Sequence, residues 1–82
     1  MPNPLHDPSY AIFRVMLADV RKQSGVTQVE LAARLGKPQS YVSKYERGER
    51  RLDFVEFLAV ADAVGADLVG FVAEYRMRIS RR

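Results

Sequence analysis

Two short motifs in the middle of the sequence fix where helices begin. In each, a side chain that can accept a hydrogen bond is followed three residues later by a glutamate: Thr27 with Glu30, and Asp53 with Glu56. This capping-box pattern satisfies backbone amides that the first turn of a helix leaves unpaired. The motifs therefore predict helices that start at about residues 28 and 54.

Glycines supply the corresponding helix ends. Gly25, Gly36, Gly48 and Gly65 each follow a stretch that reads as helical, and glycine readily adopts the left-handed conformation that terminates helices. No alternation typical of strands survives for five residues anywhere. The sequence therefore predicts an all-α fold of five short helices, over about residues 8–24, 28–35, 39–47, 54–64 and 68–79.

Apolar residues recur at steps of three and four, so each predicted helix has one apolar face. The side chains expected inside are Ile12, Phe13, Met16, Leu17, Val20, Leu31, Ala32, Leu35, Val42, Tyr45, Phe54, Phe57, Leu58, Ala61, Leu68 and Phe71. The pattern predicts one domain over residues 8–79, preceded by an irregular arm over 1–7 and followed by a basic tail over 80–82.

The composition narrows the chemistry. With 82 residues and no cysteine, the chain has room for one small core, and disulfides and thiolate metal sites are excluded. His6 is the only histidine, so neither a metal nor a cofactor is expected. Helix pairing and capping account for Glu46, Glu49, Asp53 and Glu56 better than acid–base catalysis does, which predicts a protein that is not an enzyme.

The N-terminus shows no export signal, because Met1–Pro8 holds three prolines and no lysine or arginine. The longest apolar run is Phe57–Ala61, far shorter than a membrane span. We therefore expect a cytoplasmic protein without a membrane partner, and too small to include a sensor domain or a site for a small effector.

The helix predicted over 39–47 has a polar face suited to DNA. Placed at helical angles, Val42 and Tyr45 fall on one side. The other side has no acid and carries Gln39 at its tip, then Ser40, Ser43, Lys44 and Arg47. Amide, hydroxyl and cationic groups are the ones that pair with base edges and phosphates. Between residues 34 and 51, six basic residues face two acids, whereas the whole chain has a net charge of +3.

Residues 26–36 (VTQVELAARLG) and 40–48 (SYVSKYERG) resemble the phage repressor and Cro-type helix-turn-helix family, the XRE type. The resemblance covers about residues 17–66. It implies a five-helix, lambda-repressor-like DNA-binding domain that regulates transcription as a homodimer. Each protomer would insert helix 39–47 into the major groove of a (pseudo)palindromic operator in double-stranded DNA, with half-sites roughly 34 Å apart.

The resemblance also implies residue roles. Base reading is assigned to Gln39, Ser40, Ser43 and Lys44. Gln28 would hold a phosphate, and Arg21 with Glu46 would form a structural ion pair. The sequence departs from the family at Pro38, where the usual capping side chain is lost, and also at Lys37 and Tyr45.

Three sets of residues keep two interpretations. Arg47, Arg50 and Arg51 either grip phosphates or form a solvated charge cluster, whereas Lys37 is assigned to a phosphate. Tyr41 either contacts DNA or packs on the turn between the two helices. Val72, Tyr75 and Ile79 either cap the core or form a dimer interface. The basic residues at the C-terminus are either disordered, or contact flanking DNA, or bind an acidic partner; they are Arg76, Arg78, Arg81 and Arg82.

Two further functions stay open on the sequence alone. The chain could be an antitoxin whose segment 75–82 binds a partner toxin while helix 39–47 binds the operator. Alternatively, the helix-turn-helix could be a protein-interaction module without a DNA role, which the acid-free face argues against.

Overall fold

The computed structural model describes residues 7–81, and these form five helices and no strand. They are α1 (Pro8–Gln23), α2 (Gln28–Leu35), α3 (Gln39–Glu46), α4 (Phe54–Val64) and α5 (Leu68–Arg81). The all-α prediction is confirmed. Of the expected arm only Asp7 belongs to the described residues, and Arg82 of the expected tail lies outside them.

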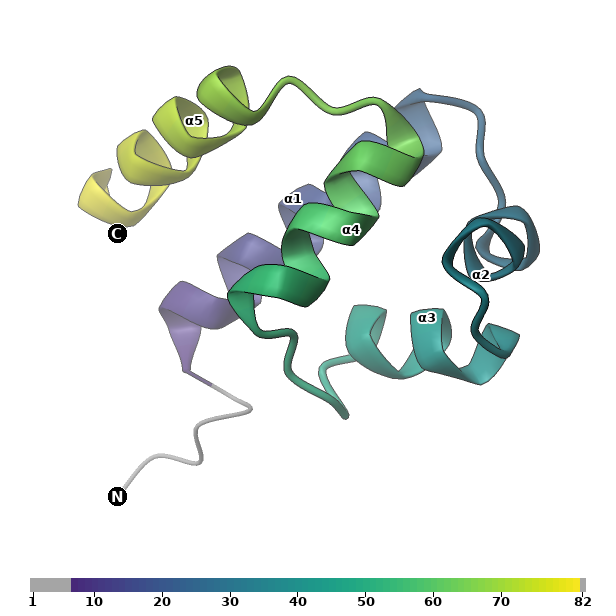
Figure 1. The fold of residues 1–82 in the computed structure, drawn as a ribbon. Coiled ribbons are helices and arrows are strands. Elements are labelled where there is room, and N and C mark those ends of the chain that lie inside the picture. Colours follow the sequence, from purple (N-terminus) through teal and green to yellow (C-terminus); the bar gives the residue numbers. More distant parts are fainter. Residues whose placement is uncertain (1–6, 82) are drawn as a thin grey trace.

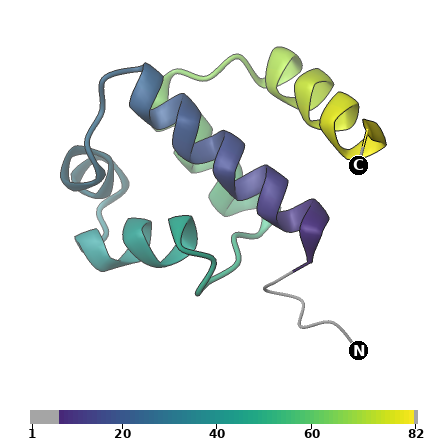
Figure 2. The same ribbon diagram turned by 180° about the vertical axis from the view of Figure 1, so that it is seen from behind.

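The helices surround a central pair. Helices α1 and α4 lie one behind the other in the middle of the molecule, with α2 and α3 on one side and α5 on the other (Figure 1). The view from behind shows the same division (Figure 2). The outer side of α3 and the outer side of α5 are therefore separate surfaces.

Local hydrogen bonds explain the helix starts. The Thr27 hydroxyl accepts from the Glu30 amide at 3.0 Å, and the Glu30 carboxylate accepts from the Thr27 amide at 2.9 Å. Asp53 and Glu56 repeat the arrangement at 2.8 and 2.9 Å. Asp7 caps α1 by accepting from the Ser9 amide at 2.9 Å. The predicted capping boxes are confirmed.

Three predicted helix ends need correction. Helix α5 continues through Arg81, two residues beyond the expected end at Ile79, so Ser80 and Arg81 belong to the helix rather than to a separate tail. Ser24 and Arg47 lie just after α1 and α3 as C-caps, not within these helices.

The core lies where α1, α2, α3 and α4 meet, and α5 closes one side of it. Leu17, Leu31, Val42 and Tyr45 have no exposed surface. The prediction that Phe54 points inward is wrong, because 70% of this side chain is exposed. It lies at the first turn of α4, where the apolar period places it at the edge of the buried face beside Phe57, with ring centres 6.4 Å apart.

The hydroxyl group of Tyr45 is buried and has no hydrogen-bond partner among the described residues. The same burial raises the pKa of Tyr45. We expect Tyr45→Phe to raise the free energy of unfolding by about 1–2 kcal/mol, because it removes an unpaired polar atom and keeps the ring. Urea denaturation measures this change.

Tyr10→Phe is the matched control. The Tyr10 hydroxyl accepts from the Leu52 amide at 2.9 Å in a buried position, so its removal leaves that amide unpaired and should lower stability. A loss of stability in Tyr45→Phe would mean that its hydroxyl has a partner in solution.

Candidate nucleic-acid interface

A tight turn sets the angle between α2 and α3. Gly36 ends α2 in the left-handed conformation, with φ at 68°, and the Lys37 amide returns to the Ala32 carbonyl at 2.9 Å. Pro38 then stands at the N-cap of α3 without a side-chain hydrogen bond. As expected from the sequence, no side chain caps α3 at this position. Helix α3 still begins at Gln39, because the fixed φ of proline suits a helix start.

A buried ion pair joins α1 to the end of α3. The Arg21 guanidinium donates to both carboxylate oxygens of Glu46, at 2.7 and 3.0 Å, and to the Val26 carbonyl at 2.8 Å. Only 9% of the Arg21 side chain and 8% of the Glu46 side chain are exposed. The hydrogen bond to Glu46 raises the pKa of Arg21. Arg14 adds a 2.7 Å bond to the Glu46 carbonyl.

Gln28 extends this ion pair to the starts of α2 and α3. Its side-chain nitrogen donates to the Glu46 carboxylate at 2.8 Å, and its oxygen accepts from Gln39 at 3.5 Å. One Gln28 N–H remains for a phosphate, since a primary amide has two. The arrangement couples Gln28 to the orientation of α3, a link for which the sequence held no signal.

The outer face of α3 is open. Gln39, Ser40 and Lys44 are exposed, and Ser43 is half-buried with its hydroxyl donating to the Ser40 carbonyl at 3.3 Å. The Lys44 ammonium forms no ion pair with the described residues. The structure therefore brings the four predicted base-reading residues together on one helix face.

Several of the basic residues around α3 already have hydrogen-bond or ion-pair partners within the chain. Arg47 pairs with Glu49 at 2.6 Å, and Arg50 pairs with Glu56 at 2.7 Å. Arg34, which contributed to the predicted positive balance, donates to the Ala63 carbonyl at 2.7 Å and so binds the end of α4.

Tyr41 is half-buried between two cations. Arg50 lies 4.7 Å and Lys37 lies 5.4 Å from the centre of its ring. The Tyr41 hydroxyl is 3.4 Å from the Glu56 carboxylate, and burial raises its pKa. The Tyr41 ring is thus packed against neighbouring side chains, as in the second of its two interpretations. The two cations beside the ring, Lys37 and Arg50, lie at the surface next to α3. Arg51 stacks instead over the Tyr10 ring, at 4.3 Å.

Glu56 makes the stability of this region depend on pH. Its bonds to Arg50 and to the Asp53 amide lower its pKa below the ordinary value of 4.5. The lowered pKa contributes stability that is complete above that value and is lost as the pH falls through the folded-state pKa.

We expect the free energy of unfolding to fall as the pH drops below 4.5, the ordinary pKa of a glutamate, and Glu56→Gln to show a smaller fall over the same range. Urea denaturation at several pH values measures both slopes. Equal slopes would mean that Glu56 titrates alike in the folded and unfolded chains. Asp62→Asn, an exposed carboxylate of α4 with no ion pair, is the matched control.

The three residues of α5 that were predicted for a dimer interface lie in different environments. The Tyr75 hydroxyl donates to the Ser9 carbonyl at 2.9 Å and its ring lies against Phe13, so Tyr75 joins α5 to α1 within the chain. Ile79 is half-buried, whereas Val72 remains 47% exposed.

The described residues contain no group of three or more histidine, cysteine, aspartate or glutamate side chains that could hold a metal ion. Within residues 7–81, no helix has the length and apolar character needed to cross a membrane.

Comparisons with known proteins agree with this geometry. A helix-turn-helix family model matches residues 17–71. An uncharacterized HTH-type transcriptional regulator, y4dJ of Sinorhizobium fredii, is 38% identical over 55 residues, which cover 67% of this chain and 71% of that protein.

Solved structures show the same fold. An XRE-family like protein from Pseudomonas syringae pv. tomato is 41% identical, with a TM-score of 0.82 and 89% of each chain covered. The restriction-modification controller protein C.Esp1396I is 20% identical, with a TM-score of 0.81 over 90% of this chain and 97% of that one. The same controller has been solved as a tetramer in complex with its natural 35 base-pair operator, with a TM-score of 0.80.

Proposed function

The chain belongs to the helix-turn-helix family of the XRE type, and on this premise we propose that it regulates transcription by binding a specific operator as a homodimer. The acid-free outer face of α3 is the observation that carries the proposal. It presents amide, hydroxyl and ammonium groups to one side, and these are the groups that distinguish base pairs in the major groove.

Specific reading also requires that α3 hold a fixed angle to the rest of the domain. The hydrogen bonds from Arg21 and Gln28 to the Glu46 carboxylate supply that constraint from two other helices. Because the bonded groups are mostly buried, solvent does not compete for them. Base contacts then depend on a rigid helix rather than on a loop.

We assign base reading to Gln39, Ser40, Ser43 and Lys44, and phosphate contacts to the groups that surround them. Lys37 and Arg50 flank α3 beside Tyr41, and Arg47 follows its last turn. Arg47 and Arg50 each have a carboxylate partner in the free chain, so a phosphate would have to compete with Glu49 or Glu56. Gln28, the first residue of α2, keeps one side-chain N–H for a phosphate contact.

The first experiment is selection of bound fragments from random double-stranded DNA, followed by titration of the selected and a random sequence at several salt concentrations. We expect a selected sequence with two related half-sites and an affinity that falls as salt rises. Retention of no fragment at low salt would contradict the proposal and favour a protein-interaction module.

Lys44→Ala tests the reading face. We expect it to reduce discrimination between the selected and random DNA by about 1–3 kcal/mol, because a base contact stabilises only the correct sequence. Gln28→Ala should instead weaken both DNAs alike, because it removes a phosphate contact while the two bonds from Arg21 still hold Glu46 and the angle of α3. Fluorescence anisotropy titrations measure both.

Lys22→Ala is the control for charge alone, since Lys22 is an exposed lysine of α1 and belongs neither to α2 and α3 nor to the turn between them. An equal loss on both DNAs for Lys44→Ala would show that Lys44 contacts phosphate and not a base.

A homodimer needs a self-complementary surface, and an exposed apolar set on α4 and α5 is the candidate. Phe54, Val55 and Val69 are 70%, 74% and 82% exposed, and Val72 is 47% exposed. The Phe54 ring contacts Phe57, whose ring centre lies 5.4 Å from that of Phe71 on α5, so one row of rings connects the two helices. Exposed apolar groups of this size favour an interface. Val72 therefore stays in the proposed interface, while Tyr75 acts within the protomer.

A further inference from the structure

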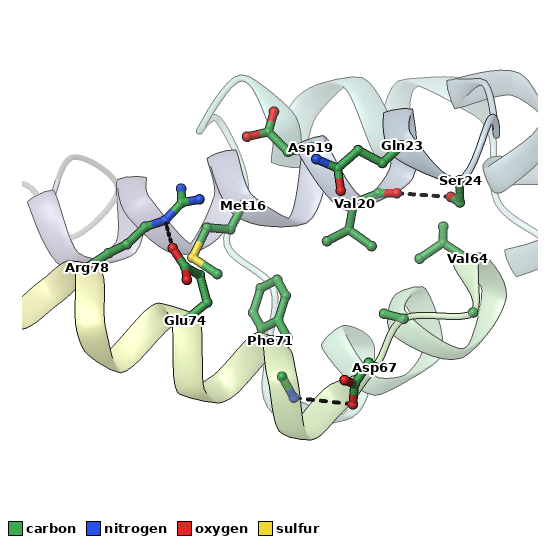
Figure 3. Close-up of a pocket in the computed structure, with 13 residues that line it drawn as sticks. Met16, Asp19, Val20, Gln23, Ser24, Val64, Asp67, Phe71, Glu74 and Arg78 are labelled. Carbon is green, nitrogen blue, oxygen red and sulfur yellow. Dashed lines mark hydrogen bonds and ion pairs between the residues drawn. The ribbon is translucent and has the colours of Figure 1, made fainter.

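A cleft of about 460 Å³ lies between α1 and α5, and the recognition surface does not include it. The turn of chain that leads from α4 into α5 closes one end (Figure 3). Its floor contains Met16, Val64 and Phe71, which are 4–7% exposed. The volume falls in the range of small-molecule sites, and a buried apolar floor is typical of them.

The mouth of the cleft is acidic in a chain whose net charge is positive. Asp19, Asp67 and Glu74 line it, together with a single cation, Arg78. Arg78 pairs with Glu74 at 2.7 Å, and Asp67 accepts from the Gly70 amide at 3.2 Å. Asp19 forms no hydrogen bond or ion pair with the described residues. The excess of negative charge at the mouth favours a positively charged ligand.

The helix ends around the cleft favour the same sign of charge. The end of α1 lines it with Val20 and Gln23 of the last turn and with Ser24, the C-cap, and the C-terminal end of a helix attracts cations. The N-terminal end of α5 has the opposite polarity and attracts anions. The Asp67 carboxylate caps this first turn and so offsets that attraction.

Gly70 keeps one wall of the cleft without a side chain. A Cβ at this position would lie 2.6 Å from the Asp67 carboxylate. Glycine inside a helix costs about 0.5–1 kcal/mol relative to alanine, so the first turn of α5 gives up helix stability at a residue that lines the cleft. The wall of the cleft is therefore open at Gly70, beside the Asp67 carboxylate, which its hydrogen bond to the Gly70 amide holds in place.

We propose that this cleft binds a small organic cation with an aryl or alkyl body. The body would lie on Met16, Val64 and Phe71, and the ammonium group would face the carboxylates at the mouth, with Asp19 as its principal partner. The proposal differs from the expectation from chain length that no small effector could bind. It does not depend on the DNA-binding function.

The test uses 2-phenylethylamine as the probe, with 2-phenylethanol and phenylacetate as its neutral and anionic counterparts. Two-dimensional NMR of the ¹⁵N-labelled protein should show amide shifts confined to Val20, Gln23, Gly70 and Phe71. We expect the amine to bind at least about threefold more tightly than the alcohol, and the acid to produce no saturable shift, because only the charge differs.

Asp19→Asn should weaken the amine at least threefold and leave the alcohol unchanged. Asp62→Asn removes an exposed carboxylate on α4, outside the cleft, and should leave both unchanged. Arg78→Ala removes the only cation at the mouth and should strengthen binding of the amine. The spectrum of each variant also reports whether it is folded.

Equal affinities of amine and alcohol would overturn the proposal, as would equal effects of Asp19→Asn and Asp62→Asn. Shifts centred on residues outside the cleft would overturn it as well. Each of these results leaves the DNA titrations unaffected, so the two proposals fail separately.

Discussion

Glu46→Ala should lower the free energy of unfolding by about 3–5 kcal/mol. The Glu46 carboxylate accepts two bonds from Arg21 and one from Gln28, and its removal leaves the Arg21 guanidinium buried without its partner. Breaking one side of a buried ion pair has a cost of about this size. An 82-residue domain has only about 4–12 kcal/mol in total, so the variant loses a large share of its stability.

A double substitution separates the charge from the packing. Arg21→Met combined with Glu46→Leu removes both charges and keeps side chains of similar length in the same space. We expect this variant to be much more stable than Glu46→Ala, because replacing a whole buried pair with apolar residues is often close to neutral. Chemical denaturation of the three proteins measures the difference.

Glu49→Ala is the matched control. Glu49 also pairs with an arginine, but 54% of its side chain and 57% of the Arg47 side chain are exposed, and ion pairs this exposed to solvent contribute little to stability. A loss in Glu46→Ala no larger than that in Glu49→Ala would contradict the structural role of the buried pair.

The sequence predicted the parts of this fold that local chemistry determines. Capping boxes at Thr27 and Asp53 require only residues three positions apart, and glycine at a helix end requires only its own backbone. These signals located all five helices to within two residues. The resemblance to a family supplied the pairing of Arg21 with Glu46, which no local pattern contains.

Contacts between distant residues could not be predicted in this way. The helical period places Phe54 near the apolar face of α4, yet no neighbour covers it at the first turn. Arg34 looks like part of a basic DNA-facing cluster, and its partner, the Ala63 carbonyl, lies 29 positions further along the chain. The cleft between α1 and α5 depends on how two helices pack, which chain length does not indicate.

Val72→Glu should yield monomers and weaken binding to a two-half-site operator about 30-fold or more, while binding to random DNA changes little. A monomer contacts one half-site, so it loses about half of a specific binding energy that typically amounts to about 4–10 kcal/mol. Because Val72 is 47% exposed within the chain, the charge should leave the protomer folded.

Val15→Glu controls for a surface charge, since Val15 is 46% exposed, belongs to α1 and lines a small pocket with Arg78 rather than the exposed apolar set of α4 and α5. Sedimentation gives the oligomeric state of each variant, and anisotropy titration gives its affinity for the operator. If Val72→Glu remains a dimer with unchanged affinity, the interface lies away from the exposed apolar side chains of α4 and α5. If it becomes a monomer with unchanged affinity, one protomer is enough for recognition, and the two half-sites are read independently.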